Sequence, residues 1–373
     1  MAGKFIWSPA MDLITLGLFV LGLVLLTLGA DILVRGAAHL AGALGISSLV
    51  IGLTVVAFGT SAPELAVSTA SAWKGQADIA IGNVVGSNIF NILFILGISA
   101  LIIPLAVQQQ LLRLDVPIMI AASVLLLFMS LDHVLSHMDG AILFGGIVLY
   151  TAFLIRHSRK ESAAVTSEYA DGVEVREEDG QPHWAKNIGF LLLGLVMLVI
   201  GSRWLVEGAV MFARGLGVSE LVIGLTVVAA GTSLPEVATS ITAALRGERD
   251  IAVGNVIGSN IFNILCVLGI SSMVSPAGIS VAETAIQFDI PVMIAIAAAC
   301  LPIFFAGRII SRGNGAMLFG YYIAYTLYLV LTAQHTPAIN SLNIAMLWFV
   351  IPLTVITLAI GVGRELRKKT GSA

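Results

Sequence analysis

The sequence predicts an all-α polytopic membrane protein, with two inverted-topology repeats of five transmembrane helices and an eleventh, C-terminal helix. Two observations lead to this fold class. Apolar residues make up 58% of the chain and charged residues only 11%, against about 25% charged residues in soluble domains. In addition, one stretch of sequence occurs twice at a constant offset.

The repeated stretch comes in two blocks. IGLTVVAFGTSAPE at 51–64 agrees with IGLTVVAAGTSLPE at 223–236 in twelve of fourteen positions. At the same offset of 172 residues, 78–97 and 250–269 agree in sixteen of twenty positions. The chain therefore contains two copies of one unit.

The apolar segments are near or above the length needed to cross about 30 Å of hydrocarbon. In chain order, the expected spans cover about 11–43, 46–72, 77–103, 115–131 and 139–156, then 187–216, 219–245, 250–274, 284–306, 315–333 and 342–362. The first run is too long for a signal-peptide core, so we expect it to be retained as a helix. The second copy begins after five spans, an odd number, so we expect the two copies to have opposite orientations.

This pattern divides the chain into four parts. The expected units are a first repeat at 1–156, a polar cytoplasmic linker at 157–186, a second repeat at 187–333, and an extra helix with a basic tail at 334–373. The linker is acidic and shows no hydrophobic periodicity, so we expect it to be disordered.

Charge placement predicts the orientation in the membrane. With the N-terminus outside, fifteen of the nineteen lysine and arginine residues fall in inside segments, as the positive-inside rule requires. The exceptions are Lys4, Lys74, Arg203 and Arg214. We therefore expect a multi-pass protein of the inner (plasma) membrane with a cytoplasmic C-terminus. The net charge of −3 and the absence of a large basic cluster argue against nucleic-acid binding.

Several charged residues outside the repeated blocks have local explanations. Pairs at i and i+4 can neutralise themselves near the membrane edge, and these are Asp31 with Arg35 and Arg203 with Glu207. Asp115 and Asp289 each precede a proline by two residues at the start of a span. We expect both aspartates to cap their helices.

The first block places polar groups on one face of the second helix of each repeat. In the first repeat these are Ala57, Thr60, Ser61 and Glu64, at i, i+3, i+4 and i+7. Pro63 has no N–H to donate, so carbonyl groups near it can turn toward a ligand. The second repeat has Ala229, Thr232, Ser233, Pro235 and Glu236 in the same arrangement.

The second block adds neutral oxygens on the third helix of each repeat. Asn83, Ser87 and Asn91 share one face, and their counterparts are Asn255, Ser259 and Asn263. We interpret Ser87, Asn91, Ser259 and Asn263 as ligands. The pairs Gly82 with Gly86 and Gly254 with Gly258 are typical of closely packed membrane helices.

These groups together predict an intramembrane cation site. A lone carboxylate within the membrane costs several kcal/mol unless it is compensated, and neither block contains a basic partner for Glu64 or Glu236. The donors are oxygens, without His or Cys, which suits hard cations and disfavours zinc or copper. Two bidentate glutamates with two carbonyls near Thr60 and Thr232 would reach the six ligands of a calcium site. Sodium would compete for the same ligands, while manganese and magnesium stay open.

The motifs GTSAPE with GNVVGSNIFN, and GTSLPE with GNVIGSNIFN, resemble the two alpha repeats of the sodium/calcium exchangers in the cation/Ca²⁺ antiporter superfamily. The resemblance implies a prokaryotic antiporter, not an enzyme, that exchanges Na⁺ for Ca²⁺ by alternating access, without a resident cofactor or an obligate protein partner. It implies a calcium site of Glu64 and Glu236 with the carbonyls of Thr60 and Thr232. It implies sodium sites that add Ala57, Ser61, Ser87, Ala229, Ser233 and Ser259, with Asn91 and Asn263 near the middle. The long first and sixth helices would slide as a pair.

Two departures and two alternatives qualify this resemblance. Potassium-dependent relatives have aspartate at the position of Asn263, so we expect no potassium co-transport, and the short linker leaves no room for a large calcium-sensing domain. The nearer alternative is a proton-coupled exchanger of calcium or another divalent ion, which sodium independence would identify. The distant alternative is an intramembrane hydrolase, which should present arginines to a phosphate, and neither block contains one.

Overall fold

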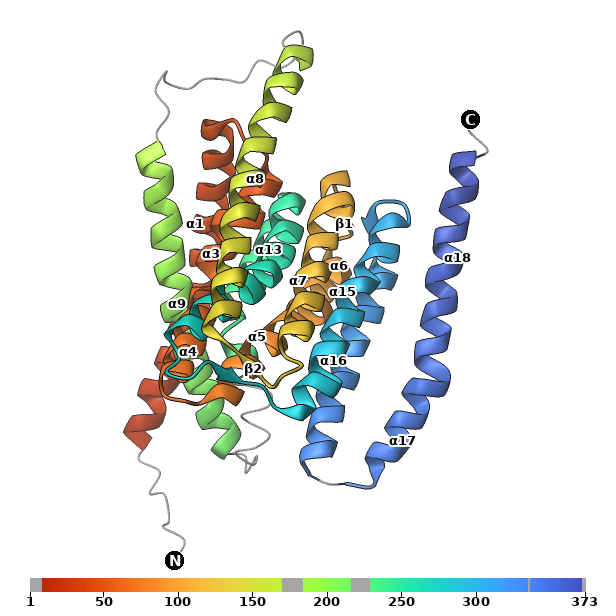
Figure 1. The fold of residues 1–373 in the computed structure, drawn as a ribbon. Helices are drawn as coiled ribbons and strands as arrows, with labels where there is room; N and C mark the ends of the chain where they lie inside the picture. Colours follow the sequence, from red (N-terminus) through yellow and green to blue (C-terminus); the bar gives the residue numbers. More distant parts are fainter. Residues whose placement is uncertain (1–8, 170–183, 216–228, 335, 371–373) are drawn as a thin grey trace, which may run out of the picture.

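The computed structural model describes residues 9–169, 184–215, 229–334 and 336–370, which form an all-helical bundle (Figure 1). Nine helices in these ranges are long and apolar enough to cross a membrane, and the bent pair Ser48–Thr60 and Ala62–Trp73 gives a tenth. The predicted span at 219–245 is described only from Ala229 onward. The predicted class, an all-α polytopic membrane protein, is confirmed.

The first repeat consists of helices with three π-helical segments and two short strands. Its elements are α1 (Pro9–Leu44), α2 (Ser48–Ile51), η1 (Gly52–Val56), α3 (Ala57–Thr60), α4 (Ala62–Trp73), α5 (Ala77–Phe90), η2 (Asn91–Leu96), α6 (Gly97–Ile102), β1 (Leu105–Ala106), η3 (Leu111–Asp115), α7 (Val116–Met129), β2 (Val134–Leu135) and α8 (His137–Tyr169).

The second repeat follows the same order, and a further helical hairpin arm completes the chain. The elements are α9 (Trp184–Gly215), α11 (Ala229–Gly231), α12 (Leu234–Leu245), α13 (Arg249–Phe262), η5 (Asn263–Leu268), α14 (Gly269–Val274), β3 (Ile279–Ser280), η6 (Ala285–Asp289), α15 (Ile290–Phe305), β4 (Ile309–Ile310), α16 (Arg312–Ala333), α17 (Ala338–Ala345), η7 (Met346–Val350) and α18 (Ile351–Thr370).

The strands reveal how the two repeats are joined. β1 of the first repeat pairs antiparallel with β4 of the second, through Leu105 and Ile310. β2 of the first repeat pairs in the same way with β3 of the second, through Val134 and Ser280. Each repeat therefore contributes its earlier strand to one sheet and its later strand to the other, as expected for two copies related by a pseudo-twofold axis.

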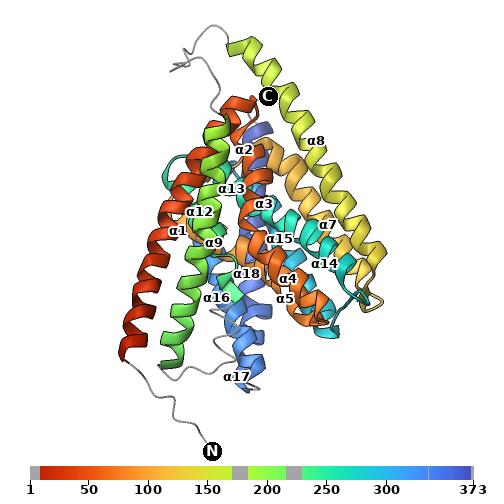
Figure 2. The ribbon, with the colours of Figure 1, turned by 90° about the vertical axis from the view of Figure 1, so that its left-hand side faces the viewer.

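Helices α1 and α9 lie side by side at one edge of the bundle (Figures 1 and 2), while α18 lies at the opposite edge (Figure 1). Glycines at seven-residue intervals let α1 and α9 approach closely. A Cβ atom added at Gly22 would lie 2.8 Å from the Gly201 carbonyl oxygen, and one at Gly194 would lie 2.7 Å from the Gly29 carbonyl oxygen. We call this contact the glycine ladder. It leaves no room for side chains between the two backbones.

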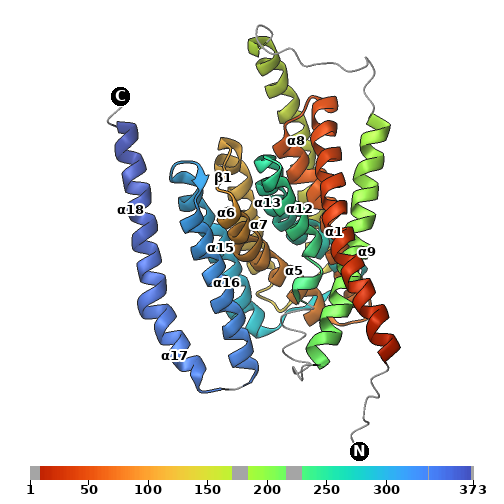
Figure 3. The ribbon, with the colours of Figure 1, turned by 180° about the vertical axis from the view of Figure 1, so that it is seen from behind.

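The centre of the bundle is formed by α5 and α13, as the view from behind also shows (Figure 3). Every residue of α13 from Ile251 to Phe262 is buried. A helix buried on all sides needs no polar face toward solvent, so its asparagines and serines must find partners inside the protein. This requirement sets the site described below.

The two predicted self-neutralising charge pairs form. Arg35 contacts Asp31 at 3.0 Å and Arg203 contacts Glu207 at 2.8 Å. Arg246, which follows the last residue of α12, also forms an ion pair with Asp31. The first pair is therefore part of a contact between α1 and α12, which the sequence alone did not indicate.

The predicted helix caps at the starts of α7 and α15 do not form. Asp115 and Asp289 make no capping hydrogen bond, because η3 and η6 continue directly into the following helices. Asp115 instead accepts hydrogen bonds from Tyr150 at 2.9 Å and from Gln110 at 3.2 Å, and Asp289 accepts one from Tyr325 at 3.2 Å.

The predicted disorder of the linker is wrong for its first part, 157–169. Helix α8 continues to Tyr169, well past His157, because Ala, Glu, Lys and Arg in this stretch favour helix even without an apolar face. The middle of the predicted linker, 170–183, lies outside the described residues.

Candidate cation site

The site begins at a break in the second helix of each repeat. α3 ends at Thr60 and α4 begins at Ala62, with 46° between the two segments. Pro63 lies in the first turn of α4 and has no N–H, so it cannot donate to the carbonyl four residues before it. In the second repeat, a turn at Thr232 and Ser233 separates α11 from α12. Both predicted breaks are confirmed.

The two breaks face each other and are linked crosswise. Ser233 Oγ donates to Glu64 Oε1 at 2.8 Å, and Ser61 Oγ donates to Glu236 Oε1 at 2.9 Å. All four side chains have no exposed surface. Each serine therefore bonds the glutamate of the other repeat, and the two carboxylates are brought into one buried polar centre.

Helices α5 and α13 pack beside the breaks and hold them in place. Thr232 Oγ1 donates to Asn83 Oδ1 at 3.3 Å, and Thr60 Oγ1 donates to Asn255 Oδ1 at 3.1 Å. Ser87 Oγ lies 3.0 Å from Ser233 Oγ. The predicted polar faces of the second and third helices thus meet, but each threonine side chain pairs with an asparagine of the opposite repeat.

Several buried oxygens of this centre have no hydrogen-bond partner. They are Glu64 Oε2, Glu236 Oε2, Asn91 Oδ1, Asn263 Oδ1 and Ser259 Oγ. Leaving a buried polar atom unpaired costs about 1–3 kcal/mol, and more for a charged group. Among the described residues, no Lys, Arg or His forms an ion pair with either glutamate. The arrangement is therefore suited to receive a cation.

The remaining predicted ligands differ in how they are placed. Ala57 is buried, and its carbonyl oxygen already accepts the Ser61 N–H at 3.0 Å and the Thr60 hydroxyl at 3.4 Å. Ala229 is the first described residue of α11, and its side chain lies outside the described part. No group of three His, Cys, Asp or Glu residues gathers in the described ranges, so the donors beside the two glutamates are neutral.

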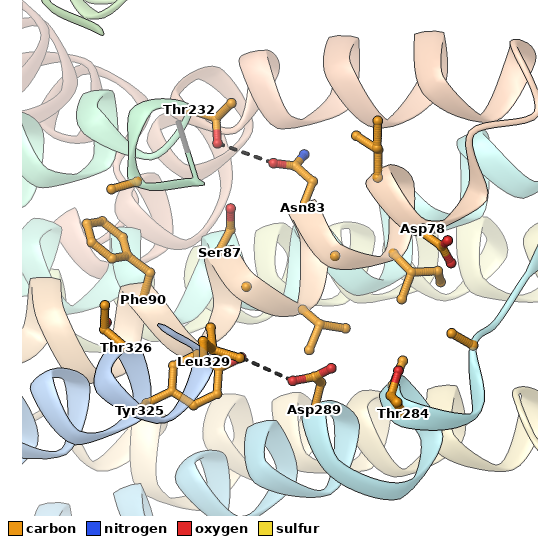
Figure 4. A pocket seen from close by; sticks show the side chains of 18 of the residues that line it. Asp78, Asn83, Ser87, Phe90, Thr232, Thr284, Asp289, Tyr325, Thr326 and Leu329 are labelled. Atoms are coloured by element: carbon orange, nitrogen blue, oxygen red, sulfur yellow. Dashed lines mark hydrogen bonds between the residues drawn. The ribbon is translucent and has the colours of Figure 1, made fainter. Parts of the chain in front are cut away.

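A cavity of about 660 Å³ reaches one side of the site, at Ser87 and Thr232 (Figure 4). It runs along α5 from Asp78 past Asn83 to Ser87, with Thr232 and Asp289 also in its wall. Gly82 and Gly86 line this cavity. The positions equivalent to Leu49 and Leu53, which pack on Gly254 and Gly258, are 221 and 225, outside the described residues, so the packing role of Gly82 and Gly86 stays a prediction.

The matching face of α13 is closed. A Cβ atom at Gly254 would lie 2.9 Å from the Leu49 carbonyl oxygen, and one at Gly258 would lie 2.5 Å from the Leu53 carbonyl oxygen. For these two glycines the predicted close packing is confirmed. Among the described residues, the face of α5 that carries Gly82 and Gly86 has no such neighbour.

Sequence reasoning missed two residues of the centre, Asn88 and Asn260. Both are buried and bond across from α5 to α13. Their signal was present, because each block keeps the asparagine, but neither residue lies on the face chosen for Asn83 and Asn91.

Comparison with known proteins identifies the family. The family model for the sodium/calcium exchanger protein matches residues 14–156 and 186–331, most of the chain. The chain belongs to the sodium/calcium exchanger family. Members of this family are secondary transporters and not enzymes, as predicted.

Individual relatives match over nearly their whole length. CaxA from Alkalimonas amylolytica is 41% identical over 83% of this chain and 96% of its own. The inner membrane protein YrbG of Escherichia coli is 37% identical, covering 84% and 96%. A solved structure of the sodium-calcium exchanger NCX_Mj, soaked with Na⁺, has a TM-score of 0.71 and 30% identity, covering 84% and 97%. This member of the exchanger family therefore shares the NCX_Mj fold.

Proposed function

We propose that this protein is a secondary antiporter that exchanges Na⁺ for Ca²⁺ by alternating access. The observation that carries the proposal is the set of unpaired buried oxygens between the two repeats, which includes one oxygen from each glutamate. Two carboxylates neutralise one divalent cation, and oxygen donors suit calcium.

In this proposal Glu64 and Glu236 bind calcium together with the carbonyls of Thr60 and Thr232. Asn91 and Asn263 add amide oxygens near the middle. Sodium ions use the same glutamates with Ser61, Ser87, Ser233 and Ser259 and the carbonyls of Ala57 and Ala229. Because the ligand sets overlap, one ion type must leave before the other binds.

Obligatory exchange has a physical reason at this site. Ser61 and Ser233 satisfy only one oxygen of each carboxylate, so an empty site leaves two buried charged oxygens without compensation. Closing the cavity over such a site would cost several kcal/mol. The protein therefore changes its open side only when cations occupy the site.

The orientation follows from charge. The cavity begins near Asp78, at the start of α5, which is at the same end of the bundle as the start of α1 (Figure 1). If the N-terminus lies outside, as the basic residues favour, the conformation described here is open to the outside. We propose a multi-pass location in the inner (plasma) membrane, as for YrbG, with the C-terminus in the cytoplasm.

The test is uptake of radiolabelled calcium into proteoliposomes loaded with sodium, compared with potassium-loaded and proton-loaded vesicles. We expect uptake only with an outward sodium gradient and none in Glu64→Gln or Glu236→Gln. Glu283→Gln is a matched control, because this exposed carboxylate contacts only His133 among the described ion pairs. Uptake driven by protons alone would replace the proposal with the proton-coupled exchanger, and full activity in both glutamate variants would remove the site assignment.

A further inference from the structure

Asn88 on α5 and Asn260 on α13 link the two central helices through reciprocal hydrogen bonds. Asn88 Nδ2 donates to the backbone carbonyl of Asn260 at 3.2 Å, and Asn260 Nδ2 donates to the backbone carbonyl of Asn88 at 3.3 Å. Both side chains are at most 1% exposed. The π-helical segments η2 and η5 begin three residues later, and such wide turns are often found at functional sites.

These two hydrogen bonds fix the orientation of the side-chain amides of Asn88 and Asn260. A backbone carbonyl can only accept a hydrogen bond, so the amide end that contacts it must be the NH₂ group. The Oδ1 atom of Asn88 and of Asn260 must therefore point away from the backbone carbonyl that its NH₂ group contacts. Each amide NH₂ group also lies 3.6 Å from a methionine sulfur, of Met293 or Met119, which is a weak acceptor.

The orientations of the Asn88 and Asn260 amides in turn set the orientations of the predicted cation ligands Asn91 and Asn263. Asn91 Nδ2 donates to Asn260 Oδ1 at 3.0 Å, and Asn263 Nδ2 donates to Asn88 Oδ1 at 3.1 Å. Since an amide has its oxygen and nitrogen at opposite ends, the oxygens of Asn91 and Asn263 are turned the other way. Both oxygens are buried and have no partner, as expected for groups that await a cation.

We infer that Asn88 and Asn260 are positioning residues that hold the amide oxygens of Asn263 and Asn91, respectively, toward the cation. The inference rests on the proposed function of the site. An amide that turned over would present its NH₂ group to a positive ion and lose a ligand. The pairing is crosswise, because each positioning residue controls the ligand of the other repeat.

The test measures calcium binding to purified, full-length protein by isothermal titration calorimetry. Asn260→Leu keeps the number of non-hydrogen side-chain atoms but removes the acceptor for Asn91 Nδ2. The side-chain amide of Asn91 can then rotate and exchange the positions of its oxygen and nitrogen. We expect the affinity to fall about tenfold or more, as for the loss of a hydrogen-bond-type contact to a charged group. Asn88→Leu should weaken binding to a similar extent through Asn263.

Rescue distinguishes positioning from a general structural role. In Asn91→Asp both ends of the side chain are oxygens, so its orientation no longer matters. We expect Asn260→Leu not to lower the affinity when added to Asn91→Asp, because the introduced carboxylate oxygen would face the Asn260 Oδ1, which is also an acceptor, and would lose no hydrogen bond when Asn260 is replaced. Asn91→Asp should not rescue Asn88→Leu, whereas Asn263→Asp should. If Asn260→Leu costs the same in both backgrounds, or if either aspartate rescues both leucine variants, the inference is wrong.

A substitute variant and a binding measurement on the wild-type protein separate loss of folding and loss of function from loss of positioning. If Asn260→Leu does not fold, as judged by gel filtration and thermal unfolding, Asn260→Ser replaces it, since a hydroxyl can donate or accept and gives Asn91 no fixed orientation. The same rescue by Asn91→Asp is then required. If the wild-type protein binds neither calcium nor sodium, the proposed function fails; if it binds but the crosswise rescue is absent, only the positioning role fails.

Discussion

Alternating access predicts that equivalent glycines in the two repeats respond differently to the same substitution. In Gly258→Ala, the new Cβ atom would lie 2.5 Å from the Leu53 carbonyl oxygen and 2.7 Å from its Cα atom. Both are backbone atoms, which cannot move aside as a flexible side chain can. In Gly86→Ala, the equivalent atom would have no neighbour within 4 Å in the part of the chain that the structure describes, where Gly86 faces the cavity.

The expected magnitude follows from packing. Overpacking a close contact typically costs about 1–3 kcal/mol, and only conformations in which α13 is pressed against η1 pay this cost. A difference of that size changes the ratio of two conformations by about 5- to 150-fold. Gly258→Ala should therefore shift the protein away from the conformation described here, while Gly86→Ala should leave it populated.

The assay is the labelling rate of a cysteine in the cavity wall. Thr326→Cys provides the thiol, and the native Cys266 and Cys300 are buried and should react slowly with a membrane-impermeant reagent. We expect Gly258→Ala to lower the labelling rate about threefold or more, and Gly86→Ala to leave it unchanged. Equal rates in the two glycine variants would refute the reasoning.

Three more predictions concern the site and the glycine ladder. Glu64→Gln should weaken calcium binding about a thousandfold or more, since two unit charges 4 Å apart interact by about 4 kcal/mol near a protein surface. Sodium binding should fall less because its charge is half as large; equal losses in calorimetry would contradict this. Lowering the pH should inhibit exchange, because a protonated carboxylate no longer attracts the cation, so a flat profile of vesicle uptake from neutral to mildly acid pH would count against the site. Gly29→Val should lower the thermal stability in detergent, since its Cβ atom would lie 2.8 Å from Met197 Cβ. Gly17→Val, with no neighbour within 4 Å among the described residues, should not; equal melting temperatures would exclude a tight ladder.

The sequence predicts those features that depend on covalent structure and periodicity. The break before Glu64 follows from Pro63, which has no N–H, and the common face of Asn83 and Ser87 follows from helical spacing. The repeat then doubles each feature. This is why the fold class and the polar centre could be predicted from one chain.

The pairing across the pseudo-twofold axis could not be predicted. That Ser233 bonds Glu64, rather than Glu236 three residues away, depends on how the two repeats dock. The partners of Asp115 and Asp289 were missed because Tyr150 and Tyr325 lie on other helices of the same repeat, and the sequence pattern does not show how those helices pack.

The glycine ladder has a mechanical consequence. Its glycines recur every seven residues, from Gly22 to Gly29 on α1 and from Gly194 to Gly201 on α9. This spacing is about 10 Å along a helix. Any shorter displacement of one helix along the other would push leucine and methionine side chains into spaces that hold only hydrogen atoms. In the sliding motion that the family resemblance implies, α1 and α9 would therefore move together as one rigid unit, and the sliding surface would be their contact with the remaining helices and not the contact between the two.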